Sequence, residues 1–133
     1  MLANQINREY VRTDSWSVVA KVSRDENAEQ WTEVKIPNVA AGGLLFLTDL
    51  EFADDDELWF DLLIDPMMPG IAGKIPMKVK GVVRGDRGIK DGLHAYSAVF
   101  TMISKGDRIR LDELVRMTNV KYKMDSESDI FDR

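Results

Sequence analysis

Two short polar stretches carry the residue types best suited to holding a flat, anionic ligand. The first contains Arg8 and Arg12, and the second begins at Asn38 and ends with the pair Gly42 and Gly43, just before an apolar run. An arginine guanidinium pairs bidentately with phosphate or with the O6 and N7 acceptors of guanine, and it stacks on a base. An asparagine amide offers a donor and an acceptor to a base edge, and paired glycines let a backbone approach a flat ligand closely. These residue types predict a site for a nucleotide-sized group.

The spacing of the two arginines is compatible with such a group in either backbone conformation. The two side chains lie about 13 Å apart in an extended chain and about 6 Å apart in a helix. The ordinary alternative is that surface arginines recur at this spacing by chance and that an asparagine before glycines marks a turn. The two stretches in this order, ahead of an apolar strand, are more specific than either alone.

Catalytic and metal-binding motifs are absent from the sequence. It contains no phosphate-binding loop, no glycine-rich dinucleotide turn and no His-Glu-x-x-His motif. His94 is a lone histidine in a predicted strand, and no nucleophile has a base beside it. Residues 54–56 are three aspartates that could bind a hard cation, although a run of acids in a turn is usually only solvated. We therefore expect no enzyme, no catalytic residue, no resident metal and no cofactor.

Composition places the chain among soluble, single-domain proteins. Its 133 residues are 44% hydrophobic and 31% charged, which suffices for a core and is atypical of disorder. It has no cysteine, which excludes disulfides and thiolate metal sites and fits a cytoplasmic location. We expect no membrane span and no signal peptide, since neither pattern occurs. The net charge of -5 argues against a general DNA or RNA binder, so local arginines must attract an anion against the overall field.

Apolar and alternating runs predict six β-strands. They cover residues 16–22, 31–36, 44–48, 57–64, 76–84 and 93–102. Pro37 is expected to end the second strand, so that residues 38–43 form a connection, and residues 85–92 are expected to be a hairpin connection. Residues 65–75, rich in proline and glycine, are the best candidate for a loop insertion. Six short strands followed by one helix predict a mainly β fold, a small six-stranded antiparallel barrel that a C-terminal helix plugs or flanks.

The hydrophobic period changes to that of a helix after the last strand. Ser104 is a suitable N-cap, and Asn119 is a reasonable C-terminal residue. The apolar stripe of this helix is predicted to contain Ile109, Leu111, Leu114, Val115 and Thr118. Residues 125–133 are acidic and are expected to be a frayed tail. The expected organisation is an N-terminal arm at 1–14, a barrel plus helix at 15–120 and an acidic tail at 121–133.

With these motifs in view, the chain resembles the PilZ family of bacterial receptor domains for the second messenger cyclic di-GMP. The family pattern is Arg-x-x-x-Arg, then Asp/Asn-x-Ser-x-x-Gly, and it is matched here by Arg8, Arg12, Asn38 and Gly43. Residues 16–22 look like the first barrel strand of the family, residues 98–100 like its closing strand and residues 104–118 like the helix that follows. The resemblance covers residues 8–118.

The resemblance implies a split six-stranded barrel, an N-terminal arginine switch loop on the arm, and ligand binding without catalysis. Arg8 and Arg12 would clamp guanine and phosphate, Asn38 would read a guanine edge, and Gly43 with its neighbour Gly42 would leave room for the loop. Binding would change the conformation and so signal to an unidentified downstream protein that controls motility, biofilm formation or polysaccharide synthesis. The receptor would be a monomer or a homodimer.

One position departs from the family pattern, because Ala40 stands where the family has serine. A neutral hydrogen bond contributes about 0.5–1.5 kcal/mol, so the missing hydroxyl predicts ligand binding that is about two- to tenfold weaker. The charge-assisted bonds of the two retained arginines are worth about 1.5–3 kcal/mol each, which favours retained binding. Ala40 also motivates an alternative, a divergent barrel that acts as a protein-interaction adaptor without nucleotide binding. An oligonucleotide-binding barrel is disfavoured by the net charge and by the lack of aromatic residues interleaved with basic ones.

Overall fold

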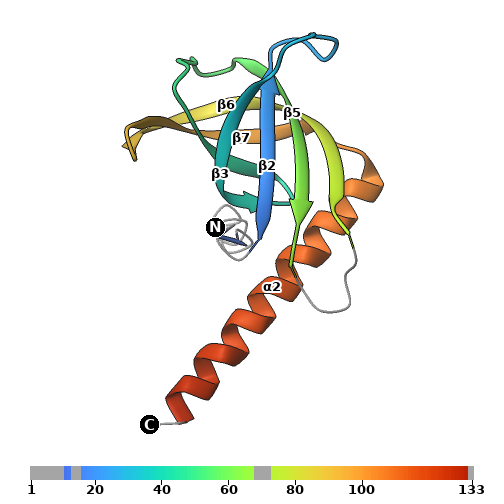
Figure 1. Ribbon diagram of the computed structural model, residues 1–133, viewed down its shortest axis with the longest axis vertical. Coiled ribbons are helices and arrows are strands. Elements are labelled where there is room, and N and C mark those ends of the chain that lie inside the picture. The colour runs from blue at the N-terminus through green and yellow to red at the C-terminus, as the bar shows by residue number, and fades with distance from the viewer. Residues whose placement is uncertain (1–10, 13–15, 68–72, 132–133) are drawn as a thin grey trace.

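The structure, a computed structural model, describes residues 11–12, 16–67 and 73–131, with side chains from Trp16 to Thr118 outside the gap. Seven strands and one helix lie in this part of the chain (Figure 1). They are β1 (Val11–Arg12), β2 (Ser17–Ser23), β3 (Thr32–Ala40), β4 (Gly43–Thr48), β5 (Glu57–Asp65), β6 (Ile75–Lys90), β7 (Leu93–Met102) and α2 (Lys105–Phe131).

Six of these strands close into an antiparallel barrel. Their order is β3-β2-β5-β6-β7-β4, and β4 pairs back onto β3 to close the ring. The short strand β1 lies outside this ring order. It pairs with Asn38 and Val39 of β3, while β2 pairs with residues 32–34 of the same strand, so β1 takes the edge of β3 that β2 leaves. The predicted six-stranded antiparallel barrel with a C-terminal helix is confirmed.

The strand β3 is longer than its sequence predicts, because Pro37 does not end it. The register to β4 shifts between Lys35 and Asn38, and Pro37 lies within that irregularity. A bulge leaves a residue out of the hydrogen-bond ladder, so a proline without an N–H is tolerated there. β3 therefore continues to Ala40 and makes a hairpin with β4 through a two-residue turn. The expectation that residues 38–43 form a connection was wrong for most of that segment.

The β6–β7 hairpin is also longer than predicted and projects from the barrel (Figure 1). Strand pairing continues through Lys90, with register shifts along the way, where we expected a loop. The turn itself is the pair Asp91 and Gly92, with φ of 54° and 78°. Positive φ at both central residues is typical of the type I′ turn, whose twist suits a two-residue hairpin. Because residues 85–92 are rich in glycine and charged residues, the sequence did not indicate that most of them pair as strands.

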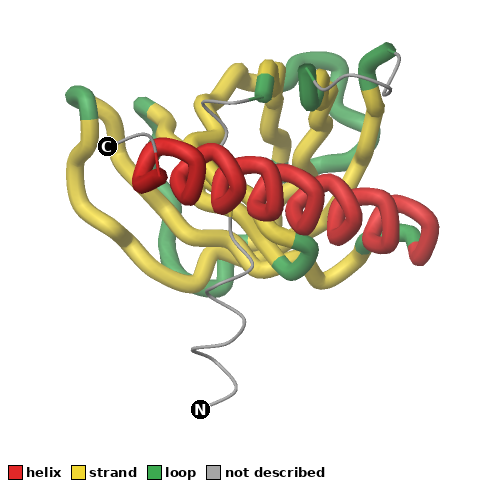
Figure 2. Tube along the Cα trace, turned by 90° about the horizontal axis from the view of Figure 1, so that it is seen from below, coloured by secondary structure: helices red, strands yellow, loops and turns green. Residues whose placement is uncertain are grey.

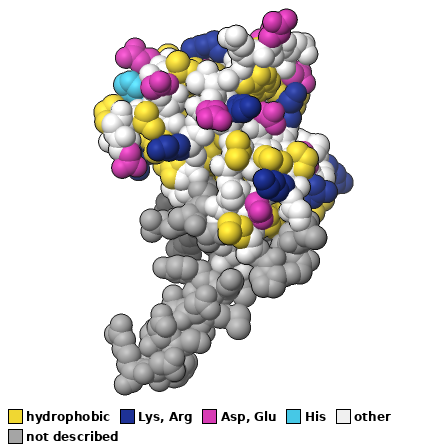
Figure 3. Space-filling model, viewed as in Figure 1, with side chains coloured by type: hydrophobic (Ala, Val, Ile, Leu, Met, Phe, Trp, Pro, Cys, Tyr) yellow, Lys and Arg dark blue, Asp and Glu magenta, His cyan; other side chains and the backbone are white. Residues whose placement is uncertain are grey.

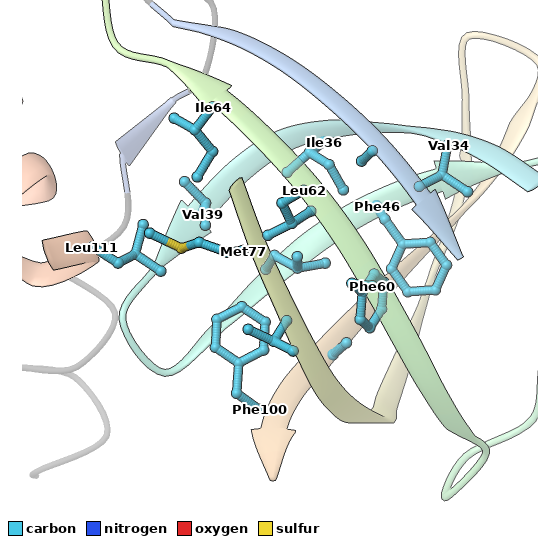
Figure 4. Packing of buried hydrophobic residues seen from close by; sticks show 14 of the residues in the cluster. Val34, Ile36, Val39, Phe46, Phe60, Leu62, Ile64, Met77, Phe100 and Leu111 are labelled. Atoms are coloured by element: carbon cyan, nitrogen blue, oxygen red, sulfur yellow. The ribbon is translucent and has the colours of Figure 1, made fainter. Parts of the chain in front are cut away.

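The core fills the barrel and continues under the helix (Figure 4). Phe46 and Phe60 are fully buried and meet edge to face, with ring centroids 5.3 Å apart. Leu111 of α2 lies beside Met77 of β6 at the end of the barrel that the helix covers. Because α2 supplies side chains to the same apolar cluster as the strands, it is an integral part of the domain.

The helix α2 lies across one end of the barrel and extends beyond it (Figures 1 and 2). Ser104 caps it as expected, since its hydroxyl accepts a hydrogen bond from the Asp107 N–H at 3.1 Å. No glycine or proline follows residue 119 to stop it, and it runs to Phe131 instead of ending near Asn119. The segment expected to be a frayed tail is therefore largely helical.

Four of the five residues assigned to the apolar stripe of the helix are buried. They are Leu111, Leu114, Val115 and Thr118. Ile109 is 50% exposed, so its assignment to the stripe was wrong. At 100° per residue, Ile109 lies about 200° around the helix from Leu111, on the side that faces away from the barrel.

Candidate functional site

The β1–β3 ladder brings the two predicted stretches together. Arg12 is the direct partner of Asn38, and Val11 is the partner of Val39. Opposed residues in an antiparallel pair have Cα atoms about 4.5–5.5 Å apart. Two segments that are distant in the sequence thus meet at the point where β3 is about to turn. Arg8 lies outside the described residues.

Asn38 and Ala40 lie on the outer face of β3. Val39 between them belongs to the core, and successive side chains on a strand point to opposite faces. Asn38 is half-buried, and among the described residues its amide has no hydrogen-bond partner. A ligand on this face could therefore use both the donor and the acceptor of the amide.

Ala40 is only 2% exposed, although it is not part of the core cluster. It is the last residue of β3 and the direct partner of Gly43 across the hairpin. A serine hydroxyl at this position would be screened from water and would need a protein or ligand partner. Ala40 avoids that requirement at the cost of one potential ligand contact.

The two glycines of the motif have different surroundings. A Cβ on Gly43 would lie 2.3 Å from the carbonyl oxygen of Ala98, which is closer than real Cβ contacts come. Gly43 is therefore required where β4 packs against β7, with or without a ligand. A Cβ on Gly42 would have no atom within 4 Å, while the Gly42 carbonyl accepts a hydrogen bond from the Phe100 N–H at 2.9 Å. Sequence reasoning assigned both glycines to ligand approach and missed the structural role of Gly43.

A separate groove of about 420 Å³ crosses the outer face of β3 nearer the N-terminal half of that strand. Its lining includes Val19, Glu33, Lys35, Leu47 and Leu93, and none of the predicted site residues in the described part of the chain. These residues come from four strands, so no local motif could have indicated them. The groove carries both charge signs above an apolar floor, which does not identify a ligand.

Two of the three aspartates at residues 54–56, the candidate cation site, make contacts within the protein. Asp56 accepts a hydrogen bond from the Ala53 N–H at 2.8 Å and one from Arg24 at 3.3 Å, and Asp55 pairs with Arg84. The Ala53 N–H is the largest influence on the pKa of Asp56 and lowers it; desolvation, the next largest, opposes this, and the hydrogen bond and charge of Arg24 lower the pKa further. Within the described ranges, no group of three or more His, Asp or Glu side chains could hold a metal ion.

His94 is half-exposed and stacks on Tyr96, with ring centroids 6.1 Å apart. Its Nε2 lies 3.9 Å from a carboxylate oxygen of Glu51. This is an ordinary surface contact, in keeping with the expectation for a lone strand histidine. None of the helices in the described part of the chain is both long and apolar enough to span a bilayer.

Comparisons with known proteins indicate the family to which the chain belongs. A protein-family model described as PilZ domain matches residues 6–117. A search of curated proteins found no match. Among solved structures, the chain is similar to the Bacillus subtilis inhibitor of motility MotI/DgrA, with a TM-score of 0.65 and 22% identity over 84% of this chain and 51% of that one. It is also similar to K. pneumonia MrkH in a complex with c-di-GMP, with a TM-score of 0.60 and 15% identity over 87% of this chain and 53% of that one.

The chain spans about half the length of each of these two proteins, and at such identities the likeness concerns the fold. The family match covers most of the chain and contains all the residues of both motifs. The resemblance drawn from Arg8, Arg12, Asn38 and Gly43 is thereby confirmed at the level of the family. The chain belongs to the PilZ domain family.

Proposed function

We propose that the protein binds cyclic di-GMP at the junction of β1 and β3 and signals the bound state to a downstream protein. The observation that carries the proposal is the register that places Arg12 opposite Asn38. The family match supports it, and one similar structure, MrkH, is a complex with c-di-GMP. The other similar protein is by its name an inhibitor of motility, which supports a regulatory output through a protein partner.

The chemistry of the two stretches fits the guanine bases and phosphodiesters of this ligand. Arg8 and Arg12 supply charge-assisted, bidentate donors, and Asn38 supplies an amide for a guanine edge. Gly42 leaves open space beside the turn, since nothing lies within 4 Å of its would-be Cβ. Because the net charge is -5, attraction of the anion must come from these local arginines.

Binding draws the arm formed by residues 1–14 over the outer face of β3, and the rearranged surface engages the partner. The domain supplies binding and a change of conformation, with no catalysis. In bacterial cells such an output acts in the cytoplasm on motility, biofilm formation or polysaccharide synthesis.

Titration calorimetry with cyclic di-GMP tests the proposal. Wild-type protein should give heat at tens of micromolar, and Arg8→Ala and Arg12→Ala should each weaken binding about 10- to 150-fold, as expected for loss of a charge-assisted bond. Lys78→Ala removes one positive charge from an exposed position on β6 and should leave the affinity near that of wild type. Absence of heat from the wild type, or equal losses in all three variants, would refute the site.

The specific observation in favour of a second function is Ala40, which lacks the hydroxyl of the family motif. In that case the barrel is a protein-interaction adaptor with an inactive nucleotide site. Capture of the same partner with and without added cyclic di-GMP, from a protein that gives no heat with the nucleotide, would favour the adaptor over the receptor.

A further inference from the structure

A buried hydrogen bond joins the segment after the arginine arm to the middle of α2. The indole Nε1 of Trp16 donates to Oγ1 of Thr118 at 2.9 Å, and that hydroxyl donates to the Leu114 carbonyl at 2.8 Å. Trp16 is 5% exposed and Thr118 is 7% exposed. The single hydroxyl thus accepts one bond and donates one, and neither buried polar group lacks a partner.

This bond fixes one end of the segment that carries Arg12. Three residues separate Arg12 from Trp16, and β2 begins directly after Trp16. At the other end, β1 pairs with β3 beside Asn38. The helix α2 also contacts both β1 and β3. The described residues on either side of Asp14 are therefore attached at two places, β1 at the edge of β3 and Trp16 at the face of α2.

The hydrogen bond adds direction to an otherwise apolar contact. The helix is held against the barrel by burial of Leu111, Leu114 and Val115. Because this apolar burial is non-directional, it does not by itself define the position of α2 along or about its axis. The indole N–H is satisfied only when Thr118 stands opposite it. A shift of α2 along or about its axis would leave a buried donor without a partner, which native structures avoid.

We propose that the Trp16–Thr118 hydrogen bond couples the arginine arm to α2, and that these two residues are positioning residues for the ligand site. The part of the proposal that concerns the ligand rests on the proposed function. The coupling is reciprocal by thermodynamic necessity. A ligand that fixes the arm therefore also favours the docked helix, and a helix that docks less tightly weakens ligand binding. Because α2 extends past the barrel, a change in its docking moves a long element that a partner protein can detect (Figure 1).

A matched pair of threonine-to-valine variants tests the coupling. Thr118→Val keeps the shape of the side chain and removes the hydroxyl. Thr48→Val does the same at a threonine that is 2% exposed, whose Oγ1 accepts a bond from the Leu50 N–H at 3.1 Å. Thr48 lies at the end of β4 that is remote from the Ala40–Gly43 turn. Both variants lose a buried hydroxyl, but only one lies between the arm and the helix.

Calorimetry with cyclic di-GMP should show an affinity about three- to tenfold weaker for Thr118→Val and near that of wild type for Thr48→Val. Thr118→Ser, which retains the hydroxyl, should recover most of the loss. Wild-type affinity in Thr118→Val, or an equal loss in both valine variants, would overturn the proposal, because the first excludes coupling and the second indicates a general loss of stability.

Hydrogen exchange without ligand separates this proposal from the proposed function. In Thr118→Val, amides of β1 and of the first residues of β2 should exchange faster than in wild type, together with those of residues 105–118. In Thr48→Val, those segments should exchange as in wild type. If wild type fails to bind cyclic di-GMP but this pattern is seen, the receptor function falls and the coupling stands. Faster exchange confined to α2 in Thr118→Val would refute the coupling.

Discussion

At the scale of single residues, Ala40 is the position where ligand affinity and fold requirements meet. It is buried at the end of β3, opposite Gly43. We expect Ala40→Ser to raise the affinity for cyclic di-GMP about two- to tenfold, because the added hydroxyl gains a ligand partner. Without ligand, the same hydroxyl is screened from water, so the free energy of unfolding should stay the same or fall slightly.

Calorimetry and urea denaturation of the same protein measure the two effects. Ala41→Ser places a hydroxyl in the adjoining turn, at a position that the family pattern leaves unspecified, and serves as the control. If Ala40→Ser binds no more tightly than Ala41→Ser, position 40 does not contact the ligand.

The neighbouring glycines provide a residue-level test of fold against ligand. Gly43→Ala should lower the free energy of unfolding by about 1–3 kcal/mol or more, because the new Cβ meets a backbone carbonyl that cannot swing away. Gly42→Ala meets nothing and has no left-handed φ to lose, so its stability should stay within about 0.5 kcal/mol of wild type. Chemical denaturation checks both, and equal stability of the two variants would contradict the close approach of β4 to β7.

The family could be recognised from its motif in the sequence, whereas the packing role of Gly43 could not be predicted there. Arginines four apart and an asparagine before glycines each recur by chance, and they are informative because they occur together, in this order, ahead of an apolar run. The requirement for Gly43 depends on Ala98, which lies far away in the chain and becomes a neighbour only when β4 pairs with β7. No local pattern records a contact made by barrel closure.

At the scale of elements, α2 is the piece whose packing decides whether the barrel end is sealed. Leu111→Ala should cost about 2–5 kcal/mol of stability, since a fully buried side chain would leave a cavity in the core. Ile109→Ala, on the exposed side of the same helix, should change stability by no more than about 0.5 kcal/mol. Thermal and urea denaturation distinguish them, and a large loss from Ile109→Ala would mean that the outer side of α2 is covered.

Element existence was predicted well and element ends poorly, for a physical reason. Alternation of apolar residues identifies a strand wherever one face is buried. The ends of β3 and β6 are instead set by bulges and by pairing with distant strands, and Pro37 is tolerated only because the register shifts beside it. The far end of α2 has no stop signal in the sequence, so the predicted end near Asn119 had little to support it.

At the scale of the whole molecule, the fold creates surface neighbours that the sequence does not show. Lys78 lies 5.5 Å from the ring of Trp31, and Lys80 lies 5.7 Å from the ring of Trp59. Aromatic and basic residues that looked scattered are therefore adjacent on the outside of the barrel. Acidic groups share this surface, and Glu57 pairs with Lys80 at 3.6 Å. On the face that carries β2 and β5, basic and acidic side chains lie interspersed (Figure 3).

The acid stability of the whole domain should depend on the contacts that join its loops at the end of the barrel remote from α2 (Figure 1). Asp56 accepts hydrogen bonds from the Ala53 N–H and from Arg24, and these lower its pKa in the folded state. A group whose folded pKa is depressed stabilises the protein above its unfolded pKa, about 3.9 for aspartate, and this contribution is lost as pH falls through the folded pKa.

Urea denaturation of wild type and Asp56→Asn between neutral pH and about pH 2 tests this dependence. Wild type should be the more stable at neutral pH, and the difference should shrink below about pH 4 and disappear in strong acid, where both side chains are uncharged. Asp54→Asn, at an exposed neighbour with no hydrogen bond among the described residues, serves as the control for the loss of one carboxylate from this turn. A wild-type advantage that stays constant down to strong acid would contradict the role of the ionised carboxylate, because protonation removes the charge that strengthens both of its hydrogen bonds.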